Sequence, residues 1–188
     1  MLRSIWFYLF IYLFIFNQNF LFSGLLPENI ILTKNNKCCS VKNLDLGDQV
    51  ASSSPTSYQL RNIYSNVSGI KLNRNSTNSA TLLTLESRKK TISSIMVGLD
   101  QKFCVQINAY DFVWLEAEDL EPNMLVLGYN NKKFRVRDVQ AIEFENSIDL
   151  YEISLNPNNT FYLIDSNGNR ILTHNVFGVT SFIKATTL

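Results

Sequence analysis

The side chains with the widest chemical range in this 188-residue chain are one histidine and three cysteines. The cysteines are an adjacent pair, Cys38 and Cys39, and a single residue, Cys104. Neighbouring cysteines rarely bridge each other, so at most one of the pair can bond to Cys104 and an odd thiol remains. The spacing fits no metal site, because a zinc centre with one histidine would need carboxylates or all three cysteines. We expect no bound metal and no cofactor.

The single histidine, His174, directly precedes Asn175 at the end of the last predicted strand. Taken alone, a histidine near a strand end is commonly a surface or capping residue, and a His-Asn pair arises by chance in many chains. Whether this pair has a role therefore depends on the elements that position it.

Composition excludes some classes of function. Seventeen basic and sixteen acidic residues leave a formal charge of +1. The longest basic run is the triplet Arg88, Lys89 and Lys90, so the chain lacks the concentrated positive charge of a nucleic-acid-binding protein. Its length fits one domain with enough residues to bury a core. We expect one domain that binds no nucleic acid.

The first 24 residues have the pattern of a secretory signal peptide. Arg3 is followed by twelve uninterrupted apolar residues, 5–16, and the segment ends in the small residues Ser23 and Gly24. Twelve residues are too few for a membrane-spanning helix, which needs about 20. We expect residues 1–24 to be removed and the protein to be secreted, periplasmic or at the cell surface.

Two other interpretations of this segment stay open. If the polar break at residues 17–19 is tolerated, residues 2–26 can remain as an uncleaved membrane anchor. A buried core helix is the third interpretation. We expect contact with a membrane only through the N-terminal segment, and only where that segment is not removed.

Short apolar runs separated by polar residues fill the chain from residue 26 onward, which is the pattern of strands and turns. Helical periodicity is nearly absent. The sequence therefore predicts an all-β domain with many tight corners. The thirteen expected strands cover residues 30–33, 49–51, 59–65, 69–72, 81–85, 92–97, 103–107, 112–115, 124–127, 133–142, 149–155, 160–164 and 170–172.

Polar residues mark the expected connections between these strands. Residues 129–132 and 165–169 are predicted hairpin turns. Residues 52–57 and 73–78 are predicted loops, and residues 116–121 are predicted to form one turn of helix or a tight acidic corner.

Near the end of the chain, two predicted strands lead to the His-Asn pair, in residues 149–155 (DLYEISL), 159–163 (NTFYL) and 171–175 (ILTHN). They resemble the two terminal strands of the Hint (hedgehog/intein) family, which end in a His-Asn pair. Two earlier blocks, in order and at appropriate spacing, resemble other blocks of the same family. Over residues 25–175 the chain is similar to an intein-like module or to the Hint modules of bacterial polymorphic toxins.

The opening and middle blocks agree with this resemblance. Residues 26–32 (LPENIIL) and 39–50 (CSVKNLDLGDQV) are similar to the family's opening strand and its xVxxLxxGDxV element, anchored by Gly47 and Asp48. Residues 99–105 (LDQKFCV), with WLEAEDL and MLVL farther on, resemble the middle block TxxHxFxV and WxxAxxLxxGxxL.

The resemblance implies an all-β, horseshoe-like Hint fold with pseudo-twofold halves, in which the start of the domain lies beside His174 and Asn175. It also implies self-cleavage in two half-reactions. At the N-terminal end, a Cys or Ser at the first position attacks the preceding carbonyl, helped by the Thr and His of the middle block. At the C-terminal end, the Asn amide attacks its own main-chain carbonyl to form a succinimide, and the neighbouring His donates a proton to the departing amine.

The residues for the N-terminal half-reaction are missing. Counting back from the Gly-Asp anchor places the nucleophile position at Leu25, which has nothing to attack with. The middle-block Thr and His positions hold Gly98 and Gln101. Gln101 can hydrogen-bond the backbone of residue 25 as an auxiliary, but an amide has no useful acid–base chemistry near neutral pH. An ordinary half-buried polar residue is the alternative for Gln101.

The residues for the C-terminal half-reaction are present as His174 and Asn175. Val176 has no hydroxyl or thiol, and splicing needs a nucleophile there in most inteins. We therefore expect autoproteolysis confined to the junction between Asn175 and Val176, with release of the short tail, residues 176–188. Such a module needs no cofactor or partner, reacts once and is not a turnover enzyme.

Two further residues have alternative interpretations. Glu152 lies where some family members have a catalytic Asp or Cys, so it is a candidate proton carrier or else a solvated strand residue. Cys104 is expected to be a small buried hydrophobe if it faces inward, rather than a second nucleophile. The alternative function for the whole chain is a catalytically degenerate Hint fold, kept as a secreted β scaffold or binding module.

Overall fold

The computed structural model describes residues 24–54, 61–109 and 111–174. The expected signal peptide, apart from Gly24, lies outside these residues, and so do Asn175, Val176 and the rest of the tail. In the described part of the chain, no helix is long and apolar enough to span a membrane. The predictions for both ends of the chain therefore rest on the sequence.

The secondary structure of the described residues consists of strands and short 3-10 helices, as the sequence predicted for an all-β domain. The strands are β1 Ile30–Leu32, β2 Cys38–Ser40, β3 Gln49–Ser54, β4 Arg61–Ser87, β5 Ile92–Val97, β6 Lys102–Gln106, β7 Phe112–Glu116, β8 Leu125–Leu127, β9 Lys133–Asn156, β10 Thr160–Ile164 and β11 Arg170–His174. The 3-10 helices are η1 Lys34–Asn36, η2 Val41–Asn43, η3 Ala117–Asp119 and η4 Tyr129–Asn131.

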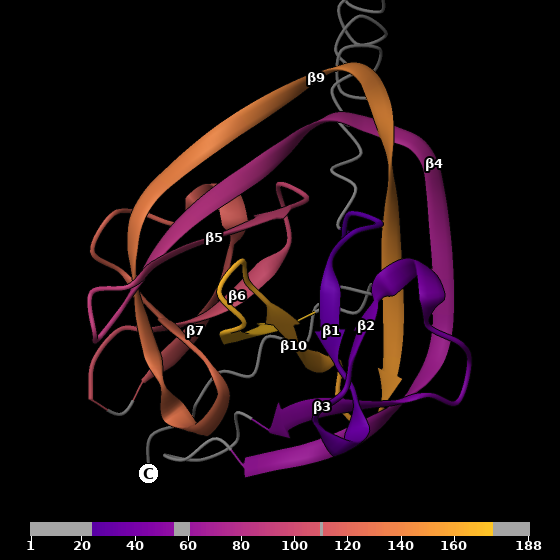
Figure 1. The fold of residues 1–188 in the computed structure, drawn as a ribbon, viewed down its shortest axis with the longest axis horizontal. Coiled ribbons are helices and arrows are strands. Elements are labelled where there is room, and N and C mark those ends of the chain that lie inside the picture. Colours follow the sequence, from indigo (N-terminus) through magenta and orange to yellow (C-terminus); the bar gives the residue numbers. More distant parts are fainter. Residues whose placement is uncertain (1–23, 55–60, 110, 175–188) are drawn as a thin grey trace, which may run out of the picture.

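Two long strands, β4 and β9, form an antiparallel ribbon that arches over the rest of the molecule (Figure 1). Their pairing runs from Asn66 opposite Asn156 to Ser87 opposite Phe134, with register shifts between residues 73 and 79. Such bulges bend a strand without ending it. The arch gives the horseshoe-like outline that the resemblance implied, while the pseudo-twofold relation of the halves stays a prediction.

The prediction of separate short strands was wrong for this ribbon. β4 joins three predicted strands and includes the predicted loop at residues 73–78, and β9 joins two predicted strands. The Asn- and Ser-rich run predicted a loop because these residues are common in turns. In the fold, β9 pairs with this run at Asn73 and Thr77. β2 and the extension of β3 to Ser54 were also missed.

The two predicted hairpin turns are confirmed. Residues 129–132 join β8 to β9 through η4. Residues 165–169 join β10 to β11, with the Asp165 N–H donating to the Asn169 carbonyl at 3.0 Å. The acidic corner at residues 116–121 contains η3, the predicted turn of helix.

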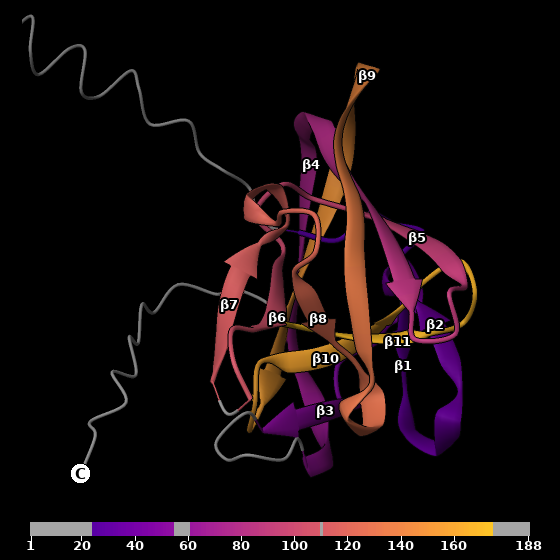
Figure 2. The ribbon, with the colours of Figure 1, turned by 90° about the vertical axis from the view of Figure 1, so that its left-hand side faces the viewer.

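The strands form one strongly curled antiparallel sheet in the order β2-β1-β10-β11-β6-β8-β9-β4-β3, with β5 beside β4 and β7 beside β6. Figure 2 shows β7 at the outer side of β6. Apolar side chains from all parts of the described chain fill the inside of the curl, among them Leu25, Ile31, Leu83, Phe103 and Phe161. Because β6 pairs with the end of β11, the segment that leads into β6 reaches the C-terminal end of the domain.

Candidate functional site

A four-residue turn, residues 98–101, connects β5 to β6 where the two ends of the described domain meet. The Gln101 N–H closes it by donating to the Gly98 carbonyl at 3.1 Å. On one side the turn bonds to Gly24 through its backbone, and on the other the Gln101 side chain bonds to His174. The start of the domain therefore lies beside its end, as the resemblance implied.

The N-terminal junction, the peptide bond between Gly24 and Leu25, is held by backbone hydrogen bonds. The Gly98 N–H donates to the Gly24 carbonyl at 3.0 Å, and Leu25 and Tyr151 exchange two N–H to carbonyl bonds of 2.8 Å. The Leu25 side chain is fully buried. The Gly24 carbonyl thus has a donor of the kind that stabilises an oxyanion, but Leu25 has no group that can attack this carbonyl.

Both glycines are required by this close approach of two backbones. A β-carbon on Gly98 would lie 2.7 Å from the Gly24 carbonyl oxygen, and one on Gly24 would lie 2.8 Å from the Leu150 β-carbon. Real β-carbons essentially never make contacts below 3.0 Å. The family's threonine therefore does not fit at position 98 unless the backbone moves.

The C-terminal junction, the His174–Asn175 peptide and the bond that follows Asn175, is described as far as His174. The fully buried Gln101 side chain donates from Nε2 to Thr173 Oγ1 at 2.6 Å and to the His174 carbonyl at 2.9 Å. The backbone of Leu25, the partner that we expected for Gln101, bonds to Tyr151 instead. The Gln101 side chain thus bonds to the C-terminal end of the domain. It is fully buried, and not the half-buried residue of the alternative interpretation.

His174 is half-buried at the end of β11, opposite Thr160 of β10 and Lys102 of β6. Its ring lies against the Trp114 ring of β7, with the ring centroids 5.2 Å apart and the planes inclined by 53°. Burial lowers the pKa of the imidazole below its usual 6.5, and the Lys102 cation lowers the same pKa further. The ring is therefore mostly neutral at pH 7 and gains a proton as the pH falls.

Glu152, the candidate proton carrier, is buried and already has partners on β4. Asn73 Nδ2 donates to Glu152 Oε1, and the Lys71 ammonium lies 3.8 Å from the same oxygen. With 8% of its surface exposed, Glu152 is not the solvated strand residue of the alternative interpretation. Its charge still reaches the 98–101 turn, because it raises the pKa of Asp100 there.

Asp100 is a buried acid in the 98–101 turn that the sequence analysis missed. Only 8% of its surface is exposed, and its Oδ1 has no hydrogen-bond partner among the residues that the structure describes. Burial raises the pKa of this carboxyl to about 6. A hydrogen bond from its own backbone N–H opposes the rise, and the nearby carboxylates of Glu116, Glu118 and Glu152 add to it. No local pattern marks Asp100, because these acids come from other segments of the chain.

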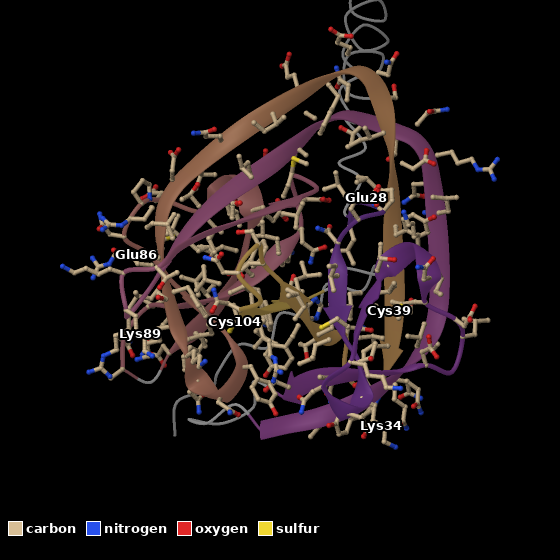
Figure 3. The ribbon with its side chains drawn as sticks, in the orientation of Figure 1. Glu28, Lys34, Cys39, Glu86, Lys89 and Cys104 are labelled. Carbon is tan, nitrogen blue, oxygen red and sulfur yellow. The ribbon has the colours of Figure 1, made fainter. Side chains whose placement is uncertain are left out.

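The described contacts give the cysteines no role at either junction. Cys104 points into the packed interior (Figure 3), and burial raises the pKa of its thiol to about 12, so it is the small hydrophobe that we predicted. Cys38 is exposed and Cys39 is half-buried, and all three thiols are free. Among the residues that the structure describes, no three His, Cys, Asp or Glu side chains are grouped to hold a metal ion.

Solved structures with the same fold include inteins and an intein-like domain. The structure matches a bacterial intein-like domain from Clostridium thermocellum with a TM-score of 0.68 and 18% identity. It matches the AceL NrdHF class 3 split intein, in a splice-inactive variant, with a TM-score of 0.62 and 16% identity. For the DnaB intein from Synechocystis the TM-score is 0.60 and the identity 12%. Each match covers 82% of this chain and 99% of the other.

This chain therefore has the fold of inteins and bacterial intein-like domains, and the resemblance to Hint domains is confirmed for the fold. No protein-family model and no curated protein matches the sequence. At identities of 12 to 18% the structural likeness concerns the backbone. The chemistry has to be argued from this chain's own residues.

Proposed function

We propose that this chain is an intein-like self-processing domain whose remaining reaction is a single cleavage after Asn175. The fold supports this class of module. The observation that carries the proposal is the anchoring of His174, whose carbonyl is held by a fully buried Gln101 side chain. A buried polar group is costly unless it is hydrogen-bonded, and the bonds of Gln101 Nε2 to Thr173 and His174 offset part of that cost. Such an anchor holds the backbone directly before Asn175, which a reaction at that residue requires.

The proposed step is the cyclisation of Asn175. Its Nδ2 attacks the carbonyl carbon of the same residue, the new C–N bond closes a succinimide, and the bond to the Val176 nitrogen breaks. His174 donates a proton to the departing amine, and the proton that Nδ2 loses restores the one on the imidazole, so no net proton is consumed. No water is consumed, so the masses of the two products add up to the mass of the parent.

A catalytically degenerate domain, kept as a secreted scaffold or binding module, is the second candidate. The fit of Gly98 against the Gly24 carbonyl favours it, because this position suits a backbone contact and has no room for the family's threonine. The two candidates differ in one observable, the stability of the bond after Asn175. Under either candidate function, we propose that the protein is secreted and loses residues 1–24, as the sequence of that segment suggests.

Intact-mass measurements on the purified full chain over time test the proposal, beside an Asn175→Ala variant. We expect slow loss of residues 176–188 from the parent, leaving a product one water lighter than the hydrolysed acid. The variant should keep its mass, because alanine has no amide to cyclise. A parent mass that stays unchanged over days would overturn the self-cleavage proposal in favour of the scaffold.

A further inference from the structure

β7 is an edge strand of the curled sheet, because among the described strands only β6 pairs with it (Figure 2). The Ile107 N–H donates to the Asp111 carbonyl at 3.0 Å where the two strands join. In an antiparallel pair, residues with backbone groups that face the partner alternate with residues whose groups face away. The register therefore turns the backbone groups of Val113 and Leu115 toward β6. The groups of the alternate residues face away from β6, and these residues are Phe112, Trp114 and Glu116.

Within the described part of the chain, nothing bonds to these outward backbone groups of β7. The edge strand β5 shows the opposite arrangement. The Ser94 N–H donates to Ser166 Oγ at 2.9 Å, and the Ser94 carbonyl accepts from the Ser166 N–H at 3.0 Å. Asn167 Nδ2 donates to the Ile92 carbonyl. The Thr160 hydroxyl of β10 likewise accepts a bond from the backbone of β3. The fold thus covers the outer sides of β5 and β3.

The side chains of β7 are apolar on both faces of the strand. Val113 and Leu115 pack against the main core, and Phe112 and Trp114 pack against a second cluster that contains the buried Cys104. All five residues of β7 are half-buried. Uncovered edge strands are commonly short or charged, as in the three-residue β2, because an open apolar edge is a template for another strand. β7 is therefore built to be extended.

Negative charge surrounds this open edge. Between Lys102 and Lys132 the sequence has no basic residue. The acids of that stretch flank β7 at both ends, and they are Asp111, Glu116, Glu118, Asp119 and Glu121. Glu116 pairs with Lys102 at 3.6 Å, while Glu118 and Asp119 are exposed. A second copy of β7 would bring acids against acids, and like charges on neighbouring strands are destabilising. The charge therefore favours a basic partner over a second copy.

We propose that the outer edge of β7 is a docking site for an extended peptide segment in which apolar and β-branched residues lie between two basic residues. The segment adds as a strand, and its backbone bonds to the outward N–H and carbonyl groups of β7. Its apolar side chains extend both faces of the strand, and its basic ends lie beside Asp111 and Glu118. Neither candidate function uses this surface, so the inference does not depend on self-cleavage.

The test adds the peptide acetyl-KVTVTVK-amide to the nitrogen-15-labelled full chain and follows backbone amide exchange by NMR. In the free protein, the amides of Phe112, Trp114 and Glu116 should exchange quickly, and those of Val113 and Leu115 slowly. At a peptide concentration of about ten times its Kd, the three outward amides should exchange about tenfold more slowly. The peptide acetyl-KVPPTVK-amide has the same charge but lacks two donors, and it should give no protection. Equal protection by both peptides, or none by either, would overturn the proposal.

A pair of double variants tests the contribution of charge. Glu118→Lys with Asp119→Lys should weaken binding of the first peptide about tenfold, because two exposed attractions become repulsions. Glu143→Lys with Glu145→Lys makes the same charge change on the β9 arch and should change the Kd less than twofold. Slow exchange of the inward amides of β7 shows in each variant that the sheet is intact. Equal weakening in both double variants would reduce the binding to general attraction and overturn the site.

The free protein distinguishes the other occupants of this edge. Outward amides of β7 that are slow without peptide and become fast when residues 176–188 are deleted would make the chain's own tail the occupant. Slow exchange that is lost on dilution would make a second copy the occupant. Either result would overturn the proposal of a separate basic peptide, and fast exchange at all protein concentrations would support it.

Discussion

The two junctions of this domain meet the same turn, residues 98–101, and are held by it in different ways. At the N-terminal junction the contact is between backbones, the Gly98 N–H and the Gly24 carbonyl. At the C-terminal junction the contact is a buried side chain, Gln101, on the His174 carbonyl. The N-terminal junction has a hydrogen-bond donor on its carbonyl but no nucleophile. At the C-terminal junction, His174 is followed in the sequence by Asn175, whose amide can act as a nucleophile.

This difference shows that the backbone arrangement at a junction does not depend on whether a reactive side chain is present there. Backbone hydrogen bonds at Gly24 and Leu25 are set by strand pairing with β9 and by the turn, and these do not depend on the side chain at position 25. Chemistry at that position depends on the side chain alone. Restoring or perturbing single groups can therefore test each junction separately.

The largest expected effect is a new cleavage at the N-terminal junction in Leu25→Cys. The cysteine sulfur would attack the Gly24 carbonyl carbon, with the Gly98 N–H placed to receive the developing oxyanion. The bond to the residue 25 nitrogen would break and leave a thioester. Incubating the full chain with dithiothreitol should then release the segment up to Gly24, as measured by mass spectrometry.

Two control variants test whether this cleavage needs the thiol and the Gly98 donor. Leu25→Ala should release nothing, since it has no thiol. Adding Gly98→Ala to Leu25→Cys should reduce the release, because the new β-carbon would meet the Gly24 oxygen at 2.7 Å and push the donor away. A folded Leu25→Cys protein that is inert to the thiol would show that backbone placement is not sufficient.

A smaller effect concerns Asp100, between the two contacts of the turn. Its pKa is raised from 3.8 to about 6, so the native state favours the protonated form. This contribution to stability is fully present below pH 3.8 and is lost as the pH rises through about 6, a change of about 3 kcal/mol. Asp100→Asn should therefore raise the free energy of unfolding by about 2–3 kcal/mol at pH 7.5 and by little at pH 4.

Denaturant titrations at both pH values measure this effect. The exposed Asp119 of η3 provides the matched control, and Asp119→Asn should change the stability little at either pH. If Asp100→Asn were no more stable than the parent at pH 7.5, the carboxyl would have to be stabilised by a group outside the described residues.

The smallest expected effect is the pH dependence of cleavage at the C-terminal junction. Burial and Lys102 hold the pKa of His174 below 6.5, so the proton-donating form is scarce at pH 7 and increases on acidification. Tail release should accelerate up to about tenfold from pH 7.5 to 6.5, since one pH unit is a tenfold change in proton activity. Lys102→Gln should shift this profile to higher pH by removing the cation. Release that accelerates with rising pH would make His174 a base instead of an acid.

Much of the fold was predictable from the sequence because strands have local signatures. Short apolar runs bounded by polar residues located β5 and β10, and the turn residues located both hairpins. The failures came at residues 73–78, where polar side chains predicted a loop and pairing with β9 kept the strand running. A local sequence pattern carries no information about a partner strand that lies about seventy residues away in the sequence.

The candidate site divides in the same way. The sequence determined which reactions are chemically available, because a nucleophile is a property of one side chain: Leu25 and Val176 have none, and Asn175 has an amide. The tertiary structure decided where the remaining polar groups act. Gln101 faces the C-terminal junction and Asp100 is buried near other acids because the curl of the sheet brings segments from three parts of the chain to one turn. Burial and orientation are properties of that packing, and single residues do not encode them.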